Sequence, residues 1–295
     1  MNSEFVSIIA EELSIPRKSV NATVKLLDDG ATIPFTSPYR KEATGALDEN
    51  VIHNIERRYR ALEALDKRKE TILASMDEQG KLTAELRRRI EETRDAAILE
   101  DIYMPFRPKR RTRAMMAMEK GLEPLARMIM AQNLDSLDKA VKKFIKGEVT
   151  DADAAIGGAS DIIAEWISDS EKARSIVRAR YLRNAVITAK VIPGKEEEGR
   201  TYENYFDYNS PLRLCTSHRL LAVLRGQKEE VLKVNVSIDD DEMIERLTRM
   251  FLRSSASPEV AAVIRSTVRD SYRRLIKPSI ETETINAAKA KADDG

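Results

Sequence analysis

The sequence has few of the residues that interrupt or cross-link a polypeptide chain. Its 295 residues include one cysteine, 11 glycines and 10 prolines, and aromatic residues make up only 5%. The single cysteine, Cys215, excludes a disulfide bond within the chain and indicates a reducing compartment. Ala, Glu, Arg, Leu and Lys are abundant, which is typical of a mainly helical protein.

The chain also lacks a surplus of charge of one sign and any long apolar run. Fifty basic and 49 acidic residues give a net charge of +1, so a nucleic-acid site would have to be local. No apolar run approaches the roughly 18 residues that suggest a membrane-spanning helix. The first residues, MNSEFVSIIAEELSI, carry acids where a secretory signal has a basic start. We therefore expect a cytoplasmic protein without a membrane segment.

One stretch, residues 48–79, is the element around which we expect the fold to be organised. It contains neither Pro nor Gly, and Gly80 follows it, where a C-cap residue belongs. As a single helix it would be about 48 Å long. Its apolar residues recur at helical spacings, and they are Val51, Ile55, Leu62, Leu65, Ile72 and Met76.

The apolar pattern of this stretch is interrupted at its centre, where residues 66–70 are all charged. A helix that is apolar at both ends and charged at its centre is typical of a strut that crosses solvent between two packed bodies. A long coiled coil is the alternative, but Asp66 and Lys69 stand where its seam needs apolar side chains.

Two short helices are predicted before the strut. The first covers residues 3–13, and Pro16 opens the second, which ends at Gly30. The pair forms either a helix-turn-helix or a small helical cap on the strut. Asp28 and Asp29 at the end of the second helix are poor chemistry for reading a DNA groove.

After the strut the pattern is mostly helical, with one clear strand. Residues 231–238, VLKVNVSI, alternate apolar and polar side chains, and a strand there needs a partner in residues 187–192 or in a domain outside this chain. Residues 194–211 read as a loop of acids and aromatic rings, and the rings are interpreted as packing anchors. Gly157 and Gly158 predict a close approach between two backbones.

Together these patterns predict a mainly α fold, an elongated multi-helical array organised on one long helix, with a minor β element near residues 231–238. The sequence suggests three regions. They are a helix-turn-helix-like cap at 1–46, a central helical region at 47–183 with the strut, and a helical region with the β element at 184–295.

The strongest candidate binding surface lies between residues 103 and 113, YMPFRPKRRTR. Two prolines keep this segment out of a helix, and it contains no acid. Clustered cations with nearby rings suit single-stranded RNA or DNA, because the cations bind phosphates and the rings stack on bases. The alternative is a latch to the acidic residues of 196–207. The candidate residues are Arg107, Lys109, Arg110, Arg111, Arg113, Tyr103 and Phe106.

Nothing in the sequence resembles catalytic machinery. There are only two histidines and one cysteine, and no Gly-rich loop is followed by the Lys and Ser/Thr of a phosphate-binding motif. Cys215 lies near Ser217 and His218 in sequence, but a packed or capping role is favoured over a nucleophile. We expect no catalysis, no cofactor and no metal site.

Four stretches resemble the Tex family of bacterial transcription accessory proteins. The first is ATIPFTSPYRKEATGALD, residues 31–48, whose signature turn contains Pro34, Tyr39, Arg40, Lys41 and Glu42. The others are residues 57–86, 99–126 and 205–234, and LEDIYMPFRPKRRTRAMMAMEKGLEPLA, the second of these, is the most specific. The resemblance extends over essentially the whole chain.

This resemblance implies more than the residue patterns do. Tex proteins continue into an RNase-H-like domain, helix-hairpin-helix units and an OB-fold RNA-binding domain, which would lie outside this chain. The family implies nucleic-acid binding in transcription and RNA metabolism, with the transcription machinery and the C-terminal domains of the same polypeptide as partners. The expected function is a nucleic-acid-associated scaffold that binds weakly by itself. The alternative is a protein-interaction module without nucleic-acid contact.

Overall fold

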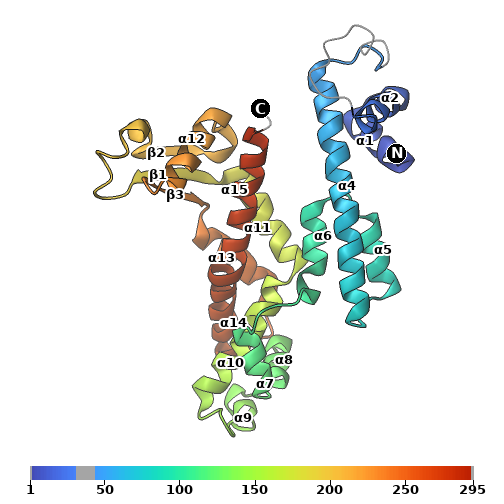
Figure 1. The fold of residues 1–295 in the computed structure, drawn as a ribbon. Coiled ribbons are helices and arrows are strands. Elements are labelled where there is room, and N and C mark those ends of the chain that lie inside the picture. Colours follow the sequence, from blue (N-terminus) through green and yellow to red (C-terminus); the bar gives the residue numbers. More distant parts are fainter. Residues whose placement is uncertain (1, 31–43, 294–295) are drawn as a thin grey trace. The chain divides into compact units, whose positions relative to one another are not determined.

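The structure is a computed structural model that describes residues 2–30 and 44–293. Most of the described chain is helical and one small sheet is present, which confirms the predicted mainly α class with a minor β element (Figure 1). The chain divides into two compact units, Met1–Phe106 and Arg107–Gly295. This boundary falls within the predicted central region, directly before the basic segment.

The first unit is built on one long helix, α4 (Glu49–Glu78), which is continuous as predicted. Asp48 caps its N-terminus by accepting a hydrogen bond from the backbone N–H of Asn50, and Gly80 follows with a φ of +67°. Five of the six residues in the predicted stripe are buried, and Val51 is half-buried. The buried residues of α4 are Ile52, Ile55, Tyr59, Leu62, Leu65, Ile72 and Met76.

Helices cover both halves of α4 within this unit (Figure 1). Helices α1 (Ser3–Leu13) and α2 (Arg17–Asp28) pack against its first half, where Ile9, Val20 and Val24 are fully buried. Its second half is flanked by α5 (Ala84–Glu92), α6 (Ala96–Tyr103) and the 3-10 turn η1 (Met104–Phe106).

The centre of α4 is not the solvent-crossing strut that the charged run predicted. Arg68 forms a two-bonded ion pair with Glu100 of α6, with N–O distances of 2.6 and 3.1 Å. Lys69 donates to the backbone carbonyl of Glu91 at 2.8 Å. Long basic side chains can cover apolar surface with their stems while their heads reach polar partners. The bridge between two bodies is therefore wrong, because α4 lies within one unit and these two charges bind its neighbours, whereas Asp66, Lys67 and Glu70 of the charged run are exposed, as a solvent-facing centre requires.

The second unit is built around α10 (Ala152–Ser168). It packs against α7 (Arg113–Glu119), α8 (Glu123–Ala131) and α14 (Pro258–Ser271). A Cβ added at Gly158 would lie 2.3 Å from Cδ1 of the buried Leu122, whereas one at Gly157 would meet nothing within 4 Å. Gly158 therefore has a close approach, but to the side chains of Leu122 and Ala117 rather than to a second backbone as predicted. The remaining helices are α9 (Leu137–Lys142), α11 (Glu171–Asn184), α12 (Ser217–Lys228), α13 (Asp240–Phe251), the π-helical turn η4 (Tyr272–Ile276) and α15 (Lys277–Asp293).

A three-stranded antiparallel sheet in this unit has the order β2-β1-β3. Strand β3 (Leu232–Ser237) pairs with β1 (Val186–Val191), which confirms the predicted partner within the chain. On the other side of β1 lies β2 (Asp207–Pro211), within the stretch that the sequence indicated to be a loop. That stretch also contains the 3-10 turn η2 (Arg200–Tyr205). A further 3-10 turn, η3 (Leu212–Leu214), directly follows the stretch.

The aromatic rings of this stretch pack as predicted. Tyr202 is buried, and Tyr205 and Tyr208 meet edge to face with ring centroids 5.3 Å apart. No helix among the described residues is both long and apolar enough to cross a membrane.

Candidate nucleic-acid interface

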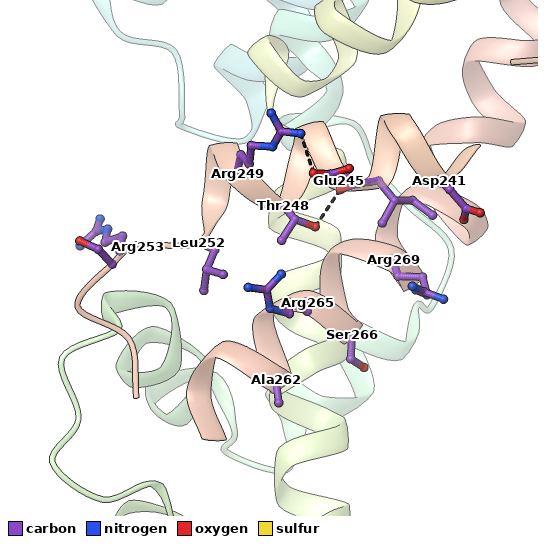
Figure 2. A pocket seen from close by; sticks show the side chains of 12 residues that line it. Asp241, Glu245, Thr248, Arg249, Leu252, Arg253, Ala262, Arg265, Ser266 and Arg269 are labelled. Atoms are coloured by element: carbon purple, nitrogen blue, oxygen red, sulfur yellow. Dashed lines mark hydrogen bonds and ion pairs between the residues drawn. The ribbon is translucent and has the colours of Figure 1, made fainter. Parts of the chain in front are cut away.

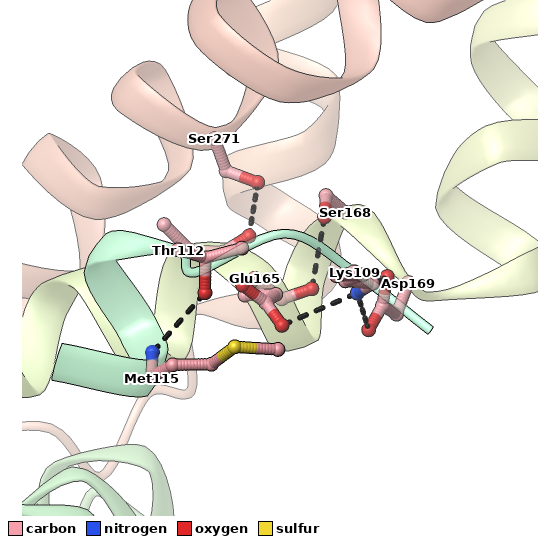
Figure 3. Close-up of polar contacts among 8 residues, drawn as sticks. Lys109, Thr112, Met115, Glu165, Ser168, Asp169 and Ser271 are labelled. Carbon is pink, nitrogen blue, oxygen red and sulfur yellow. Dashed lines mark hydrogen bonds and ion pairs between the residues drawn. The ribbon is translucent and has the colours of Figure 1, made fainter. Parts of the chain in front are cut away.

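The basic segment, residues 107–113, opens the second unit and leads into α7. Its best-fixed residue is Lys109, whose Nζ lies 3.2 Å from Glu165 Oε1 and 3.0 Å from each carboxylate oxygen of Asp169 (Figure 3). All three side chains are at most 20% exposed. A charged group removed from water needs such partners, because unpaired burial is costly. Lys109 therefore anchors the segment to α10.

The electrostatics of this anchor follow from burial. Burial raises the pKa of Asp169 above its ordinary value, and the hydrogen bond and charge of Lys109 oppose that rise. Glu165 and Asp169 are four residues apart, so one face of the helical end presents both carboxylates to the ammonium group. The sequence analysis did not identify Glu165 and Asp169 as partners of Lys109. The pattern that could have indicated them is the spacing of four residues between two acids at the end of a predicted helix.

The end of the segment is fixed as well. Thr112 caps α7, its Oγ1 accepting a hydrogen bond from the backbone N–H of Met115 at 3.1 Å (Figure 3). The backbone between Lys109 and Thr112 is therefore held at both ends, and only Arg110 and Arg111 lie between them.

These two arginines are exposed. Arg111 forms an ion pair of 2.6 Å with Glu119, but the two side chains are 68% and 61% exposed. Pairs of that kind contribute about 0–1 kcal/mol, so Arg111 can exchange this partner for another anion. Arg110 makes no hydrogen bond or ion pair with any residue that the structure describes.

The other two arginines of the segment lie at its edges. Arg107 and Arg113 are both exposed, and Arg107 also takes part in an interaction. Arg113 lies near Asp161, whose pKa is raised by burial while Arg274 and Arg113 oppose that rise. Both can add positive charge to the surface around Arg110.

The two rings proposed for base stacking take part in the packing of the first unit. Tyr103 and Phe106 belong to the first unit, whereas all five cations belong to the second. Tyr103 is 6% exposed, its hydroxyl lies 2.8 Å from Ser75 Oγ, and the Arg68 guanidinium covers its ring at 5.5 Å. Phe106 packs against the core of the first unit. The buried Tyr103 ring cannot serve as a stacking platform, because neighbouring side chains already cover it.

The alternative prediction, a latch to the acidic residues of 196–207, does not describe the contacts of Lys109. Lys109 binds acids of α10 rather than that loop. Within the loop, Glu198 pairs with Lys195 and Glu197 with Arg200. The basic segment is thus latched to a helix end through Lys109.

The remaining candidate residues are those of the signature turn and the pair Cys215 and His218. The signature-turn residues lie outside the described part of the chain, and they are Pro34, Tyr39, Arg40, Lys41 and Glu42. Cys215 Sγ lies 3.6 Å from the hydroxyl of Tyr208, and His218 Nε2 lies 3.4 Å from Thr216 Oγ1. Within residues 2–30 and 44–293, no three His, Cys, Asp or Glu side chains lie close enough together to hold a metal ion.

The fold and the basic segment together define a class of protein, a mainly helical scaffold with a locally fixed basic surface. Comparison with known sequences then gives the family. Residues 3–77 match the Tex-like protein N-terminal domain, and residues 133–295 match the family described as Tex central region-like. The chain belongs to the Tex family.

Similar proteins are found in bacteria and in animals. The chain is 38% identical over 290 residues to the transcriptional accessory protein Tex of Neisseria gonorrhoeae, covering 97% of the chain and 38% of that protein. It is 35% identical over 305 residues to protein YhgF of Escherichia coli strain K12, covering 100% and 39%. It is 27% identical over 291 residues to the human S1 RNA-binding domain-containing protein 1, covering 94% and 29%. The chain thus spans about two fifths of the length of its bacterial relatives.

Proposed function

We propose that this chain is part of a transcription accessory protein and that its helical units serve there as a scaffold which contacts single-stranded nucleic acid. The observation that carries the proposal is the anchored basic segment, in which Lys109 is fixed to α10 while Arg110 and Arg111 stay exposed. The name of the gonococcal relative supports the link to transcription, and the name of the human relative supports the link to RNA.

The anchor prepares the arginines for phosphate binding. Because Lys109 and Thr112 already hold the backbone, little conformational freedom remains to be lost when a ligand binds. Arginine is suited to phosphate because its planar guanidinium donates two parallel hydrogen bonds. Because the Tyr103 ring is buried, it cannot stack on a base, so we expect recognition of RNA or DNA to depend mainly on the backbone and to be weak.

The rest of the proposal concerns the setting of this contact. We place the protein in the cytoplasm, where it works together with the transcription machinery and with further domains of its own polypeptide. We propose no catalytic step for this chain. A labelled RNA incubated with it and Mg²⁺ should keep its length, and shortening that grows with protein concentration would contradict this part.

The direct test reverses the two exposed charges. Arg110→Glu together with Arg111→Glu should weaken binding of a single-stranded oligonucleotide by about tenfold at low salt, because two phosphate contacts become repulsive. The thermal unfolding temperature should stay near that of the unchanged protein, since both side chains are exposed.

A matched control separates a local effect from a change in net charge. Arg87→Glu with Arg88→Glu alters two exposed arginines of α5 that also pair with nearby acids. This control should bind the oligonucleotide as the unchanged protein does. Equal losses in both variants would assign the binding to bulk charge and remove the role of the basic segment.

A further inference from the structure

A groove of about 1070 Å³ lies between α13 and α14 in the second unit. The apolar residues that line it, which we call its floor, are Ile244, Leu252 and Ala262. Arg249, Arg253, Arg265 and Arg269 also line it (Figure 2). The groove residues are distant in sequence from the basic segment, and the proposed function assigns no role to them.

Helical spacing explains why the groove is open and positively charged. Ala262, Arg265 and Arg269 are three and four residues apart and share one face of α14. The small side chain of Ala262 leaves room above the floor, and the opposite face of α14 buries Ile264 and Val268 in the core. Figure 2 shows Arg265 directed toward α13 near Leu252.

The charges of the groove are unevenly satisfied. Its two acids already have cations, because Glu245 lies 2.6 Å from Arg249 and Asp241 lies 3.7 Å from Arg273. Arg265 and Arg269, in contrast, make no hydrogen bond or ion pair through their side chains with the described residues. The guanidinium groups of Arg265 and Arg269 are therefore exposed beside the apolar floor and form no ion pair with a described residue.

We propose that this groove docks an acidic amphipathic helix of a partner protein. Apolar side chains of the partner, spaced three and four residues apart, would lie on Leu252, Ile244 and Ala262, as in other grooves that bind a helix. Its carboxylates would meet Arg265 and Arg269 in paired, charge-assisted hydrogen bonds.

The chemistry of the groove favours a helix over a nucleic acid. None of the described residues that line it is aromatic, so bases would have no ring on which to stack. Asp241 and Glu245 lie in the same wall and would repel a chain of phosphates, whereas a helix can direct its carboxylates to one side.

The test uses the whole chain and a labelled synthetic peptide of about 16 residues, with leucines at helical spacing and glutamates beside them. Two other probes are a peptide in which lysines replace the glutamates and a single-stranded oligonucleotide. The groove variants are Arg265→Glu with Arg269→Glu, which reverses the charge, and Ala262→Trp, which fills the space and keeps both arginines. The control is Lys233→Glu with Arg246→Glu, two exposed cations of the same unit that do not line the groove.

The acidic peptide should bind the unchanged protein, and each groove variant should raise its Kd about tenfold or more, while the control stays within about twofold. The lysine peptide should not bind. Thermal unfolding reports whether each variant is folded. If the variant with both arginines reversed does not fold, Ala262→Trp alone tests the proposal. Arg110→Glu with Arg111→Glu should leave peptide binding unchanged, which separates this groove from the basic segment.

Three results would overturn the assignment. The first is that the acidic peptide fails to bind the unchanged protein. The second is that it binds both groove variants as tightly as the unchanged protein. The third is that the oligonucleotide competes for the groove and loses affinity when Arg265 and Arg269 are reversed, which would make the groove a nucleic-acid site.

Discussion

Lys109 and Arg110 are neighbours in a run of cations, yet they have different environments. The lysine is held by Glu165 of α10 and by Asp169 directly after that helix, whereas the arginine is exposed. The sequence predicted a local basic segment, but it could not separate these two residues. The partners of Lys109 lie 56 and 60 positions away in the chain, and no local pattern contains that information.

Removing the anchor should reveal its electrostatics. Lys109→Met leaves Asp169 and Glu165 without their cation and should cost about 1–3 kcal/mol of unfolding free energy at neutral pH. Because burial already raises the pKa of Asp169, its ionised form opposes folding once the pH rises through that pKa, and loss of Lys109 raises the pKa further.

The cost of Lys109→Met should therefore be smaller in acid than at neutral pH, because the Asp169 carboxyl takes up a proton as the pH falls through its raised pKa. Urea unfolding at both pH values measures this difference, with Arg110→Met as the control that should change little. A cost for Lys109→Met that is equal at the two pH values would show that the ion pair is not what stabilises the segment.

Single helices and strands were the best-predicted features of this protein. The end of α4 at Gly80 and the alternation in β3 are local signals, and the structure confirms both elements. The surroundings of the α4 centre were predicted wrongly, because Arg68 finds Glu100 from another helix. Strand β2 was missed because its burial comes from pairing with β1, not from an apolar pattern of its own.

Two residues of α4 test which of its faces is packed. Leu62 is 2% exposed, so Leu62→Ala should cost about 2–5 kcal/mol through the cavity that it leaves. Lys67 is exposed, and Lys67→Ala should change stability by less than about 0.5 kcal/mol. Chemical denaturation of both variants gives the comparison. Similar costs for the two would contradict the one-sided burial of α4.

The glycine pair of α10 offers a test with opposite signs at adjacent positions. Gly157→Ala meets open space and should stabilise the protein by about 0.4–1 kcal/mol, since alanine is the better helix former. Gly158→Ala would press on the buried Leu122 and should destabilise it by about 1–3 kcal/mol. Thermal unfolding of the two variants checks both signs, and stabilisation by Gly158→Ala would disprove the close approach.

At the scale of the whole molecule, the division into units changes how the candidate site is understood. The sequence placed two rings and five cations in one short segment, and the boundary between Phe106 and Arg107 assigns them to different units. Neighbours in sequence can pack into separate cores, and no composition or periodicity of a short segment reveals that. Within the second unit, the predicted surface consists of a set of exposed arginines.

The measurement that tests the central claim most directly is the salt dependence of oligonucleotide affinity. Two or three phosphate contacts on a single strand should give a slope of about −1.4 to −2.1 for log affinity against log salt. Arg110→Glu with Arg111→Glu should bring the slope close to zero while the protein stays folded. An unchanged slope in that folded variant would contradict the claim that the anchored basic segment binds nucleic acid.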